Sequence, residues 1–525
     1  MKFHYSAVKA LLSRTVNAAV ALMATLSFSA SCTQSKCTAG TEEFAYLYKD
    51  LPFEMEMVSR PSVPDRSVYI TEFGGNGNGI ASNTQAFKEA IEHLSSKGGG
   101  HLIVPEGIWY TGPIELKSCI DLHVDPLAVI IFDPDPTLYP IVETVFEGLD
   151  TKRCDAPIHA DNAHDISITG GGVIDGSGSA WRAVKKSKVN AAEWKSFLAR
   201  GGVLNDKGDL WSPSESYVKG HEMSGMNVPP RDLDDAGYEA IRDFLRPELV
   251  CFRNCENVLL EDCVFQNSPS WNLHPLMCRN VIIKGVTVRN PHYSQNGDGI
   301  DLDSCVGSII IDSSFDVGDD GICIKSGKDE DGRRRAAPCK GLIVDNCTVY
   351  HGHGGFVVGS EMSGGVEDMK VSNCRFLGTD VGLRFKSRRG RGGVVKNIYI
   401  DNIYMTDIIA ETVLFDLHYN GTSAVDAMEK GQTAQVELIP VDEGTPAFRD
   451  IWIKDIVCNG AGRAMYFNGI PEMPVRNINI DGCAIKSTRG IEINWAEDVT
   501  MTGVEISASA GDPVKTANVK NISIR

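Results

Sequence analysis

The chain has 525 residues, more than a typical single domain, although elongated all-β folds often reach this length as one unit. With 52 glycines and 42% hydrophobic residues, the composition is that of a folded, turn-rich protein and excludes a disordered one. The net charge of -18 excludes nucleic acid as a partner of the whole chain, because binding to phosphates requires a basic face.

The N-terminus has the three-part pattern of an export signal. Lys2, Lys9 and Arg14 precede a short apolar run, which is followed by the small residues SFSAS and then Cys32. The run is too short to remain as a membrane span. We therefore expect a signal peptide of the lipoprotein type at residues 1–31, with plain secretion as the alternative.

This signal predicts an exported protein, either periplasmic or an outer-membrane lipoprotein that could face the cell surface. A lipid on Cys32 is the only membrane attachment that we expect. Residues 32–65 follow as a linker and N-terminal extension, and residues 66–525 are predicted to form one domain.

The first predicted element of that domain is a helix in the segment SNTQAFKEAIEHLSSKGGG. Ser82 or Asn83 can cap its N-terminus, and the glycines end it. One face of this helix is apolar and contains Phe87, Ala90, Ile91 and Leu94.

A long segment without strand periodicity follows at about residues 180–248. It contains Trp181, Trp194 and Trp211 among mixed charges. We expect an insertion here, and a smaller one at about residues 420–448. Long loops of this kind often have a function.

From residue 257 onward, a short unit returns repeatedly. Examples are NVLLEDCVF at 257, NVIIKGVTV at 280, GLIVDNCTV at 341, NIYIDNIYM at 397 and NINIDGCAI at 477. The second, fourth, seventh and ninth positions are mostly apolar, so each half of the unit alternates like a short strand with one buried face. The sixth position is always Gly, Asn or Asp, the residues that adopt a left-handed backbone easily, which indicates a corner between two strands.

A strand-corner-strand unit that recurs at this period cannot bury its own apolar face and must stack on its neighbours. The sequence therefore predicts an all-β fold, a right-handed parallel β-helix or solenoid, whose open end is covered by the N-terminal capping helix. The seventh position, which faces inward, contains Cys263, Cys347, Cys374 and Cys483. We expect these to be buried structural thiols, since no CxxC pair accompanies them.

The segments that follow the repeats align in a second register around a shared glycine. They are NGDGIDLDS at 296, GDDGICIKS at 318, GHGGFVVGS at 352 and TDVGLRFKS at 379. Residues in one column of stacked coils are neighbours about 4.8 Å apart. This alignment places acids, an imidazole and two cations on one face: Asp298, Asp319, Asp320, His353, Arg384 and Lys386.

Clustered acids destabilise a fold by mutual repulsion, yet they have a chemical use. Hydrolysis of a glycosidic bond with inversion requires one protonated carboxyl group and one carboxylate, about 6.5 to 9.5 Å apart. Crowding among carboxylates is expected to raise the pKa of the acid.

At these positions the sequence resembles glycoside hydrolase family 28, the polygalacturonases. The family's N-x-D, paired Asp, G-H-G and R-x-K motifs match NGD at 296, DD at 319, GHG at 352 and RFK at 384. The segments FGGNGNGIASNT and VPEGIWYTGPIELKS also resemble the beginning of that family.

The resemblance implies a role for each residue. Asp319 is the general acid, Asp298 and Asp320 are the bases that hold the water, and His353 tunes the acid. Arg384 and Lys386 are expected to bind the substrate carboxylate, and Asn296 is expected to position the substrate. The local basic site for a polyanion would be extended by Arg388, Arg389 and Arg391 and by Arg333 to Arg335.

We therefore expect an inverting polygalacturonase, monomeric and independent of metals and cofactors, that cleaves α-1,4-linked galacturonate in pectin. The insertion at 180–248 favours exo-action, because its bulk would restrict an open groove. One alternative is a hydrolase of rhamnogalacturonan or another branched pectin. Others are a calcium-dependent pectate lyase and a non-catalytic β-helical adhesin or glycan-binding protein.

Overall fold

The computed structural model describes residues 43–225, 227–423, 427, 431, 436 and 438–525. The predicted export signal and Cys32 lie outside these residues. The chain divides into two compact units, residues 1–51 with 56–59 and residues 52–55 with 60–525. In the first unit, the short 3-10 helix Ala45–Tyr48 is followed by a turn, and the amide of Val58 donates a hydrogen bond to the Tyr48 hydroxyl.

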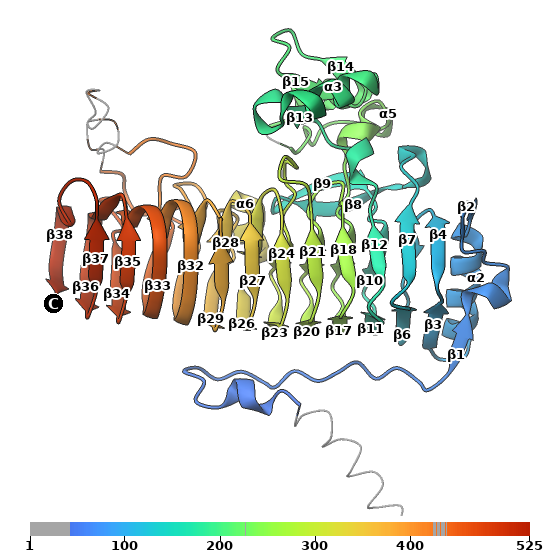
Figure 1. The fold of residues 1–525 in the computed structure, drawn as a ribbon, viewed down its shortest axis with the longest axis horizontal. Helices are drawn as coiled ribbons and strands as arrows, with labels where there is room; N and C mark the ends of the chain where they lie inside the picture. The colour runs from blue at the N-terminus through green and yellow to red at the C-terminus, as the bar shows by residue number, and fades with distance from the viewer. Residues whose placement is uncertain (1–42, 226, 424–426, 428–430, 432–435, 437) are drawn as a thin grey trace, which may run out of the picture. The chain divides into compact units, whose positions relative to one another are not determined.

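The larger unit is a right-handed parallel β-helix, as the repeat predicts. Each coil contributes one strand to each of three faces, and the strands of successive coils pair in parallel (Figure 1). The fold therefore places residues from distant parts of the chain in the same column.

The first face contains the strands that begin the repeat unit. They are β1 (Ser67–Tyr69), β3 (Gly100–Val104), β6 (Ile120–Val124), β11 (His164–Thr169), β17 (Glu256–Glu261), β20 (Arg279–Lys284), β23 (Val306–Ile311), β26 (Cys339–Asp345), β29 (Val366–Ser372), β34 (Val475–Asp481) and β38 (Val514–Ile524).

The second face contains the strands that end the repeat unit. They are β2 (Asn78–Ser82), β4 (Gly107–Thr111), β7 (Ala128–Phe132), β12 (Val173–Asp175), β18 (Val264–Gln266), β21 (Thr287–Arg289), β24 (Ser314–Asp316), β27 (Thr348–His351), β30 (Arg375–Leu377), β35 (Ala484–Ser487) and β37 (Glu505–Ala508).

The third face contains the strands of the second register. They are β5 (Ile114–Glu115), β10 (Ile158–Asp161), β16 (Val250–Arg253), β19 (Leu273–Leu276), β22 (Ile300–Asp303), β25 (Asp320–Lys325), β28 (Gly354–Gly359) and β31 (Val381–Lys386). Three longer strands, β32 (Val394–Asp416), β33 (Ala447–Asn468) and β36 (Arg489–Thr502), continue around a corner and serve more than one face.

The sixth position of each repeat adopts the predicted left-handed conformation. Its φ is 62° at Asp262, 65° at Gly285 and 51° at Asn346. The first position is a second left-handed corner that sequence reasoning missed, with φ of 57° at Asn257 and 56° at Asn397. Asn and Asp occur at both corners because their short polar side chains tolerate this conformation.

The interior of the coils is filled by aliphatic side chains stacked one above another. The fourth repeat position shows this, with Leu260, Ile283, Ile310, Val344, Val371, Ile400, Ile453, Ile480 and Met501 all buried. Burying such a side chain stabilises the fold by about 1.5–3 kcal/mol. The four predicted interior cysteines are buried as expected, and the described cysteines are free thiols.

Helix α2 (Thr84–Ser96) packs Phe87, Ala90, Ile91 and Leu94 against the first coil, as predicted for a capping helix. Asn83 occupies the N-cap position without a side-chain cap bond. Its amide group instead donates to three backbone carbonyl groups of the adjacent loop and strand.

Two segments leave the coils near the third face. One is the antiparallel hairpin β8 (Ile141–Phe146) and β9 (Leu149–Cys154). The other lies between β12 and β16 and contains α3 (Ala191–Ala199), α4 (Glu215–Met223), α5 (Asp235–Glu239) and the small sheet of β13 (Val184–Lys185), β14 (Val203–Leu204) and β15 (Leu210–Ser212). Helix α6 (Asp329–Arg335) follows β25, and a further loop separates β32 from β33.

Short 3-10 helices complete the described structure at Ile70–Phe73, Pro136–Leu138, Gly178–Ala180, Lys186–Lys188 and Arg242–Phe244. Among the described residues, no helix has the length and apolar character needed to cross a membrane.

Candidate active site

The candidate site lies on the third face, where four adjacent coils contribute β22, β25, β28 and β31. The strand register pairs Asp301 with Cys323, Cys323 with Val357 and Val357 with Arg384. The columns predicted from the sequence are therefore those of the structure. As a result, the acids, which come from the coils of β22 and β25, lie near the cations of β31, which is two coils beyond β25.

Asp298, Asp319 and Asp320 come together at the start of β25 and in the turn before β22. One carboxylate oxygen from each lies within 4.8 Å of the others. This value refers to the nearest oxygens, whereas the separation of about 6.5 to 9.5 Å expected for an inverting pair refers to the two carboxyl groups. One water molecule that forms two hydrogen bonds of ordinary length spans about 4.6 Å, so a single water can bridge two of these oxygens.

Only one of the three acids is open to solvent. The side chain of Asp319 is 22% exposed, whereas that of Asp320 is 2% exposed. Asp298 is buried as well. A ligand that entered from solvent would therefore meet Asp319 first, with the other two acids behind it.

Two cations hold Asp320. The Lys386 ammonium lies 2.6 Å from Oδ2 of Asp320, and Nη1 of Arg384 lies 3.2 Å from Oδ1. Burial favours the neutral acid, but these two charges outweigh it and lower the pKa of Asp320. Asp320 is therefore the ionised member of the buried pair.

His353 contacts Asp319 directly, with 2.8 Å between Nδ1 and Oδ1. This hydrogen bond raises the pKa of His353. Burial would raise the pKa of Asp319, but the hydrogen bond from His353 reverses the effect and lowers it. In the free protein, the proton of this pair therefore resides on the imidazole.

The expectation that crowding raises the pKa of Asp319 is thus wrong for the free protein. The raised pKa belongs to Asp298, because burial and the nearby charge of Asp301 both favour its neutral form. The physical reason is the different set of neighbours: Asp319 has an imidazole partner, whereas Asp298 is surrounded mainly by other acids.

A second layer of charge lies beneath the acids and was not assigned a role from the sequence. Asp301 is fully buried, and its Oδ1 is 3.4 Å from the ammonium of Lys325. That ammonium also lies 3.1 Å from Glu361 and 4.6 Å from the ring centre of Trp271. Burial, opposed by Lys325, raises the pKa of Asp301 to about 7.

Tyr419 is a further site residue that sequence reasoning missed. Its ring centre lies 5.0 Å from the Lys386 ammonium and 5.8 Å from the Arg384 guanidinium. The residue belongs to the loop after β32, outside both repeat registers, so no sequence pattern indicated it. The aromatic face stabilises the two cations at the edge of the site.

Asn296 lies beside the acids, but other protein groups hold its side chain. Its Oδ1 accepts a hydrogen bond of 3.1 Å from Arg246, and its amide donates to Glu147 at 3.5 Å. Its backbone amide donates to Oδ2 of Asp319 at 3.3 Å. Asn296 thus links the acid cluster to the hairpin.

The hairpin β8–β9 occupies the third face on one side of the site. Phe146 stacks on Trp271 with 4.8 Å between ring centres, and the Arg153 guanidinium covers Phe146. At the tip, the carbonyl of Gly148 accepts a hydrogen bond from the backbone amide of Lys328 at 3.0 Å. The hairpin is thus packed onto the sheet and anchored at its end.

The insertion between β12 and β16 forms hydrogen bonds with the hairpin. Arg153 in β9 donates to the carbonyl of Arg246 at the end of the insertion. Asn227 donates to Glu147 at the hairpin tip. The third face therefore has a wall next to the acids, built from the hairpin as well as from the predicted insertion.

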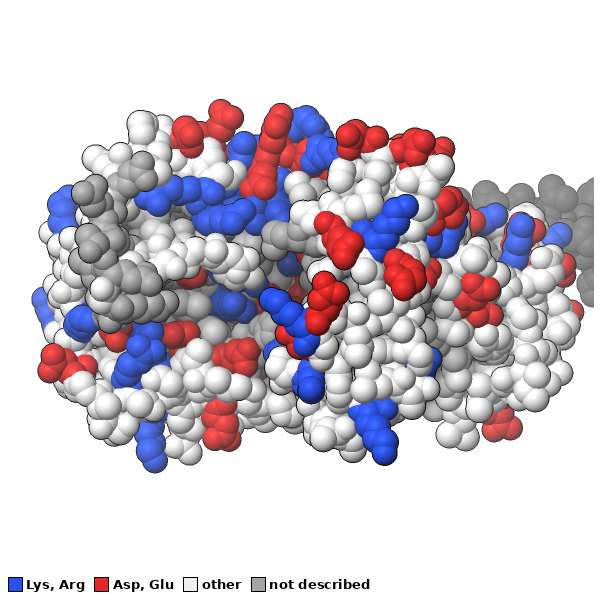
Figure 2. Space-filling model, turned by 90° about the horizontal axis from the view of Figure 1, so that it is seen from above, with Lys and Arg blue, Asp and Glu red and all other residues white. Residues whose placement is uncertain are grey.

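Most arginines of the predicted basic site are bound to other protein groups. Arg389 pairs with Glu472, Arg391 with Asp329, and Arg334 with Asp150. They brace the loops around the site. Figure 2 looks onto this side of the molecule and shows Lys and Arg side chains gathered around a hollow in the left half of the view.

Comparison with known proteins gives one consistent picture. A family model described as glycosyl hydrolases family 28 matches residues 234–445, which include every predicted site residue. The chain is 29% identical over 458 residues to a probable polygalacturonase of Vitis vinifera, covering 85% of this chain and 79% of that protein. It is 24% identical over 479 residues to an exo-poly-alpha-D-galacturonosidase of Dickeya chrysanthemi, covering 87% and 74%.

Among solved structures, a hyperthermoactive exopolygalacturonase from Thermotoga maritima matches with a TM-score of 0.69 and 32% sequence identity. The match covers 87% of this chain and 95% of that chain. The similarity therefore extends over the coils and the segments that surround the acids.

Proposed function

Because the chain belongs to family 28 of the glycosyl hydrolases, we propose that it is a polygalacturonase that hydrolyses α-1,4-galacturonosidic bonds from the end of a pectic chain. The observation that carries this proposal is the meeting of three carboxyl groups with two cations on one face. Asp319 faces solvent in front of Asp298 and Asp320, and Arg384 and Lys386 lie beside them.

Asp319 is the general acid of the proposed reaction. The Asp319–His353 pair holds one proton across 2.8 Å, and transfer from Nδ1 to Oδ1 makes the carboxyl group able to protonate the leaving oxygen. The bond between C1 and this oxygen then breaks. After product release, the pair regains a proton from solvent, and the base returns to solvent the proton that it took from the attacking water.

Asp320 takes the proton of the attacking water. Asp320 is ionised, whereas Asp298 is neutral. The water therefore donates a hydrogen bond to Asp320 and accepts one from Asp298. When a substrate carboxylate binds Arg384, the attraction between Arg384 and Asp320 weakens. The basicity of Asp320 then rises as the substrate arrives.

Arg384 and Tyr419 form the proposed contact with the substrate carboxylate. The Arg384 side chain is 18% exposed, whereas that of Lys386 is 6% exposed and bound to Asp320. A planar guanidinium can bind a carboxylate through two hydrogen bonds. Lys386 instead fixes the position and charge of Asp320.

The wall of hairpin and insertion supports exo-action. It covers the third face next to Asn296, where Glu147 at the hairpin tip accepts a hydrogen bond from the Asn296 amide. A polymer could not continue through this wall, so only a chain end reaches Asp319. We further propose that the protein works as a monomer, which light scattering of the purified chain tests.

Sizing the products of polygalacturonate digestion tests the proposed function. We expect saturated monogalacturonate from the first time points and a loss of its release in Asp319→Asn. A spread of oligomers would overturn exo-action. An unsaturated, ultraviolet-absorbing product would indicate a lyase, and an absence of new reducing ends would indicate a binding protein.

We also propose that the protein is exported and anchored through a lipid on Cys32. The support is the signal-like pattern of residues 1–31. Metabolic labelling with a fatty acid tests this: label on the wild type that is absent from Cys32→Ala is expected. Unlabelled protein in the culture medium would indicate plain secretion.

A further inference from the structure

One residue departs from the pattern of the left-handed corner that corresponds to the first position of the repeat unit. The corner residues lie in one column and have positive φ: Gly99, Cys119, Asp165, Asn257, Asn280, Gly307, Gly341, Asp368, Asn397, Asp450, Asn477, Asp498 and Asn521. All except Cys119 are Gly, Asn or Asp. The φ of Cys119 is 61°, a conformation that costs an ordinary side chain about 1–2 kcal/mol.

The backbone alone therefore does not explain a cysteine at this corner. Elsewhere in the column, side-chain amides form a ladder: Asn280 donates to Asn257 at 2.7 Å, and Asn257 donates to Asp165 at 3.1 Å. Asp165 and Cys119 are the next neighbours in the column. A thiol cannot extend such a ladder in place of Asn, so its presence points to a different use.

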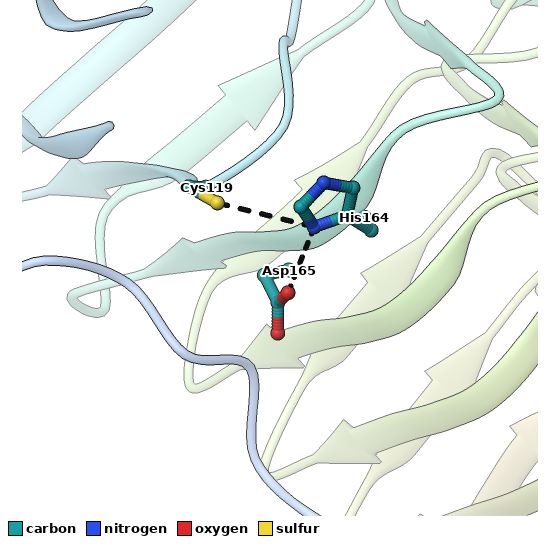
Figure 3. Close-up of side chains that lie close together, drawn as sticks. All are labelled: Cys119, His164 and Asp165. Carbon is teal, nitrogen blue, oxygen red and sulfur yellow. Dashed lines mark hydrogen bonds and ion pairs between the residues drawn. The ribbon is translucent and has the colours of Figure 1, made fainter. Parts of the chain in front are cut away.

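Cys119 lies beside His164 and Asp165, as Figure 3 shows. The Cys119 sulfur is 3.9 Å from Nδ1 of His164, and Oδ2 of Asp165 is 2.9 Å from the same nitrogen. One ligand atom from each residue lies within 4.8 Å of the others. A sulfur, a nitrogen and an oxygen atom that can each bind a metal ion thus lie close together.

Hydrogen bonds fix the backbone of Cys119 and His164 and the side chain of Asp165. The amide of Cys119 donates to the carbonyl of His164 at 2.8 Å, and the amide of His164 donates to the Ser118 hydroxyl at 3.1 Å. The other carboxylate oxygen of Asp165 accepts from the amide of Ser62 at 2.7 Å. Asp165 is therefore oriented with Oδ2 toward the imidazole.

The geometry is not that of a catalytic relay. A relay needs the acid and the nucleophile on opposite ring nitrogens, whereas both groups here approach Nδ1. Burial and the nearby Asp165 charge also raise the pKa of the Cys119 thiol, so it is protonated at neutral pH.

We propose that Cys119, His164 and Asp165 form a binding site for a divalent cation of the zinc type, separate from the acid cluster. Tetrahedral zinc with ordinary bond lengths places sulfur and nitrogen about 3.6 Å apart, and nitrogen and oxygen about 3.3 Å apart. Both separations in the structure are within about 0.4 Å of these values. A water molecule completes the tetrahedron, because the His164 side chain is 56% exposed.

Binding releases the thiol proton of Cys119, and the proton of neutral His164 moves to Nε2. The ion links the β5–β6 turn to β11 on the next coil. The site is therefore a cross-link between coils, and it has no part in the proposed hydrolysis.

Metal titration of the full chain tests the site. We expect Zn²⁺ to be withdrawn from a chromophoric chelator and Co²⁺ to give a thiolate-to-cobalt charge-transfer band, both lost in Cys119→Asn. Asn suits the left-handed corner, so this variant should fold and retain the hydrolysis rate of the wild type. His164→Ala should weaken Zn²⁺ binding at least tenfold.

His351→Ala is the matched control, because His351 also contacts an aspartate, Asp316, at 2.8 Å but belongs to no thiol-containing cluster among the described residues. Its Co²⁺ band should equal that of the wild type. Equal Zn²⁺ binding by the wild type and Cys119→Asn would overturn the proposal, as would the absence of a charge-transfer band.

Discussion

Asp319 is the only member of the acid cluster that both reaches solvent and contacts an imidazole. Replacing it by Asn removes the proton donor and leaves the shape of the side chain unchanged. We expect kcat on oligogalacturonate to fall by about 10²–10⁴, with an unchanged thermal unfolding midpoint. Steady-state kinetics and calorimetry measure the two quantities.

Asp316→Asn is the control for this variant, because Asp316 forms an exposed pair with His351 at the same distance of 2.8 Å. It should leave kcat unchanged. Asp319→Asn with a normal kcat would exclude Asp319 as the acid.

The pKa of His353 sets the alkaline limit of the proposed reaction. Its pKa lies above the ordinary 6.5 because of the hydrogen bond to Asp319, so the pair keeps its proton into the neutral range. The kcat/KM of the wild type should therefore fall only above pH 6.5. In His353→Gln, Asp319 is the sole proton source, and this alkaline limb should move to lower pH.

The pH dependence of kcat/KM on trigalacturonate measures this shift. A variant with lower activity but an unmoved alkaline limb would mean that His353 only supports the structure.

At the scale of elements, the hairpin β8–β9 determines which end of the site is closed. Gly148 at its tip has a φ of 72°, and a Cβ there would lie 2.6 Å from the backbone nitrogen of Lys328. Gly148→Ala should therefore lift the tip from the coil. We expect products longer than monogalacturonate to appear in a digest of polygalacturonate.

Gly208→Ala serves as the matched control, since Gly208 also has a positive φ of 65° but no neighbour within 4 Å. It should change neither the product sizes nor the rate. A Gly148→Ala digest that still contains monomer alone would show that the hairpin tip does not restrict the groove.

Helix α2 covers the open end of the coils and stabilises the larger unit. Phe87 is 1% exposed and packs on the first coil. Phe87→Ala should destabilise the larger unit by about 3–5 kcal/mol, because it removes a buried ring and leaves a cavity. Ile80→Ala, at a residue that is 83% exposed, should leave denaturant stability nearly unchanged. Equal effects of the two substitutions would contradict a capping role for α2.

On the scale of the whole molecule, the sequence predicted the coils and the columns well. The alternation of Val258 and Leu260 and the corner at Asp262 follow from local rules that recur in every coil. The column that brings Asp298 to Asp320 follows from stacking alone.

The features that the sequence did not predict depend on contacts between segments that have no periodicity. The hairpin at 141–154 and the ring of Tyr419 lie outside the repeats, so their positions over the site could not be derived. The pKa of Asp319 depends on the 2.8 Å contact to His353. The alignment of residues on stacked coils does not give distances between side-chain atoms.

In the proposed reaction, acids from stacked coils protonate the glycosidic oxygen and direct a water molecule onto the opposite face of the sugar. Proton NMR during digestion of trigalacturonate tests it most directly, because the anomer formed first reports the face attacked. We expect saturated β-galacturonic acid to appear before mutarotation. An α-anomer as the first product, or an unsaturated sugar, would contradict it.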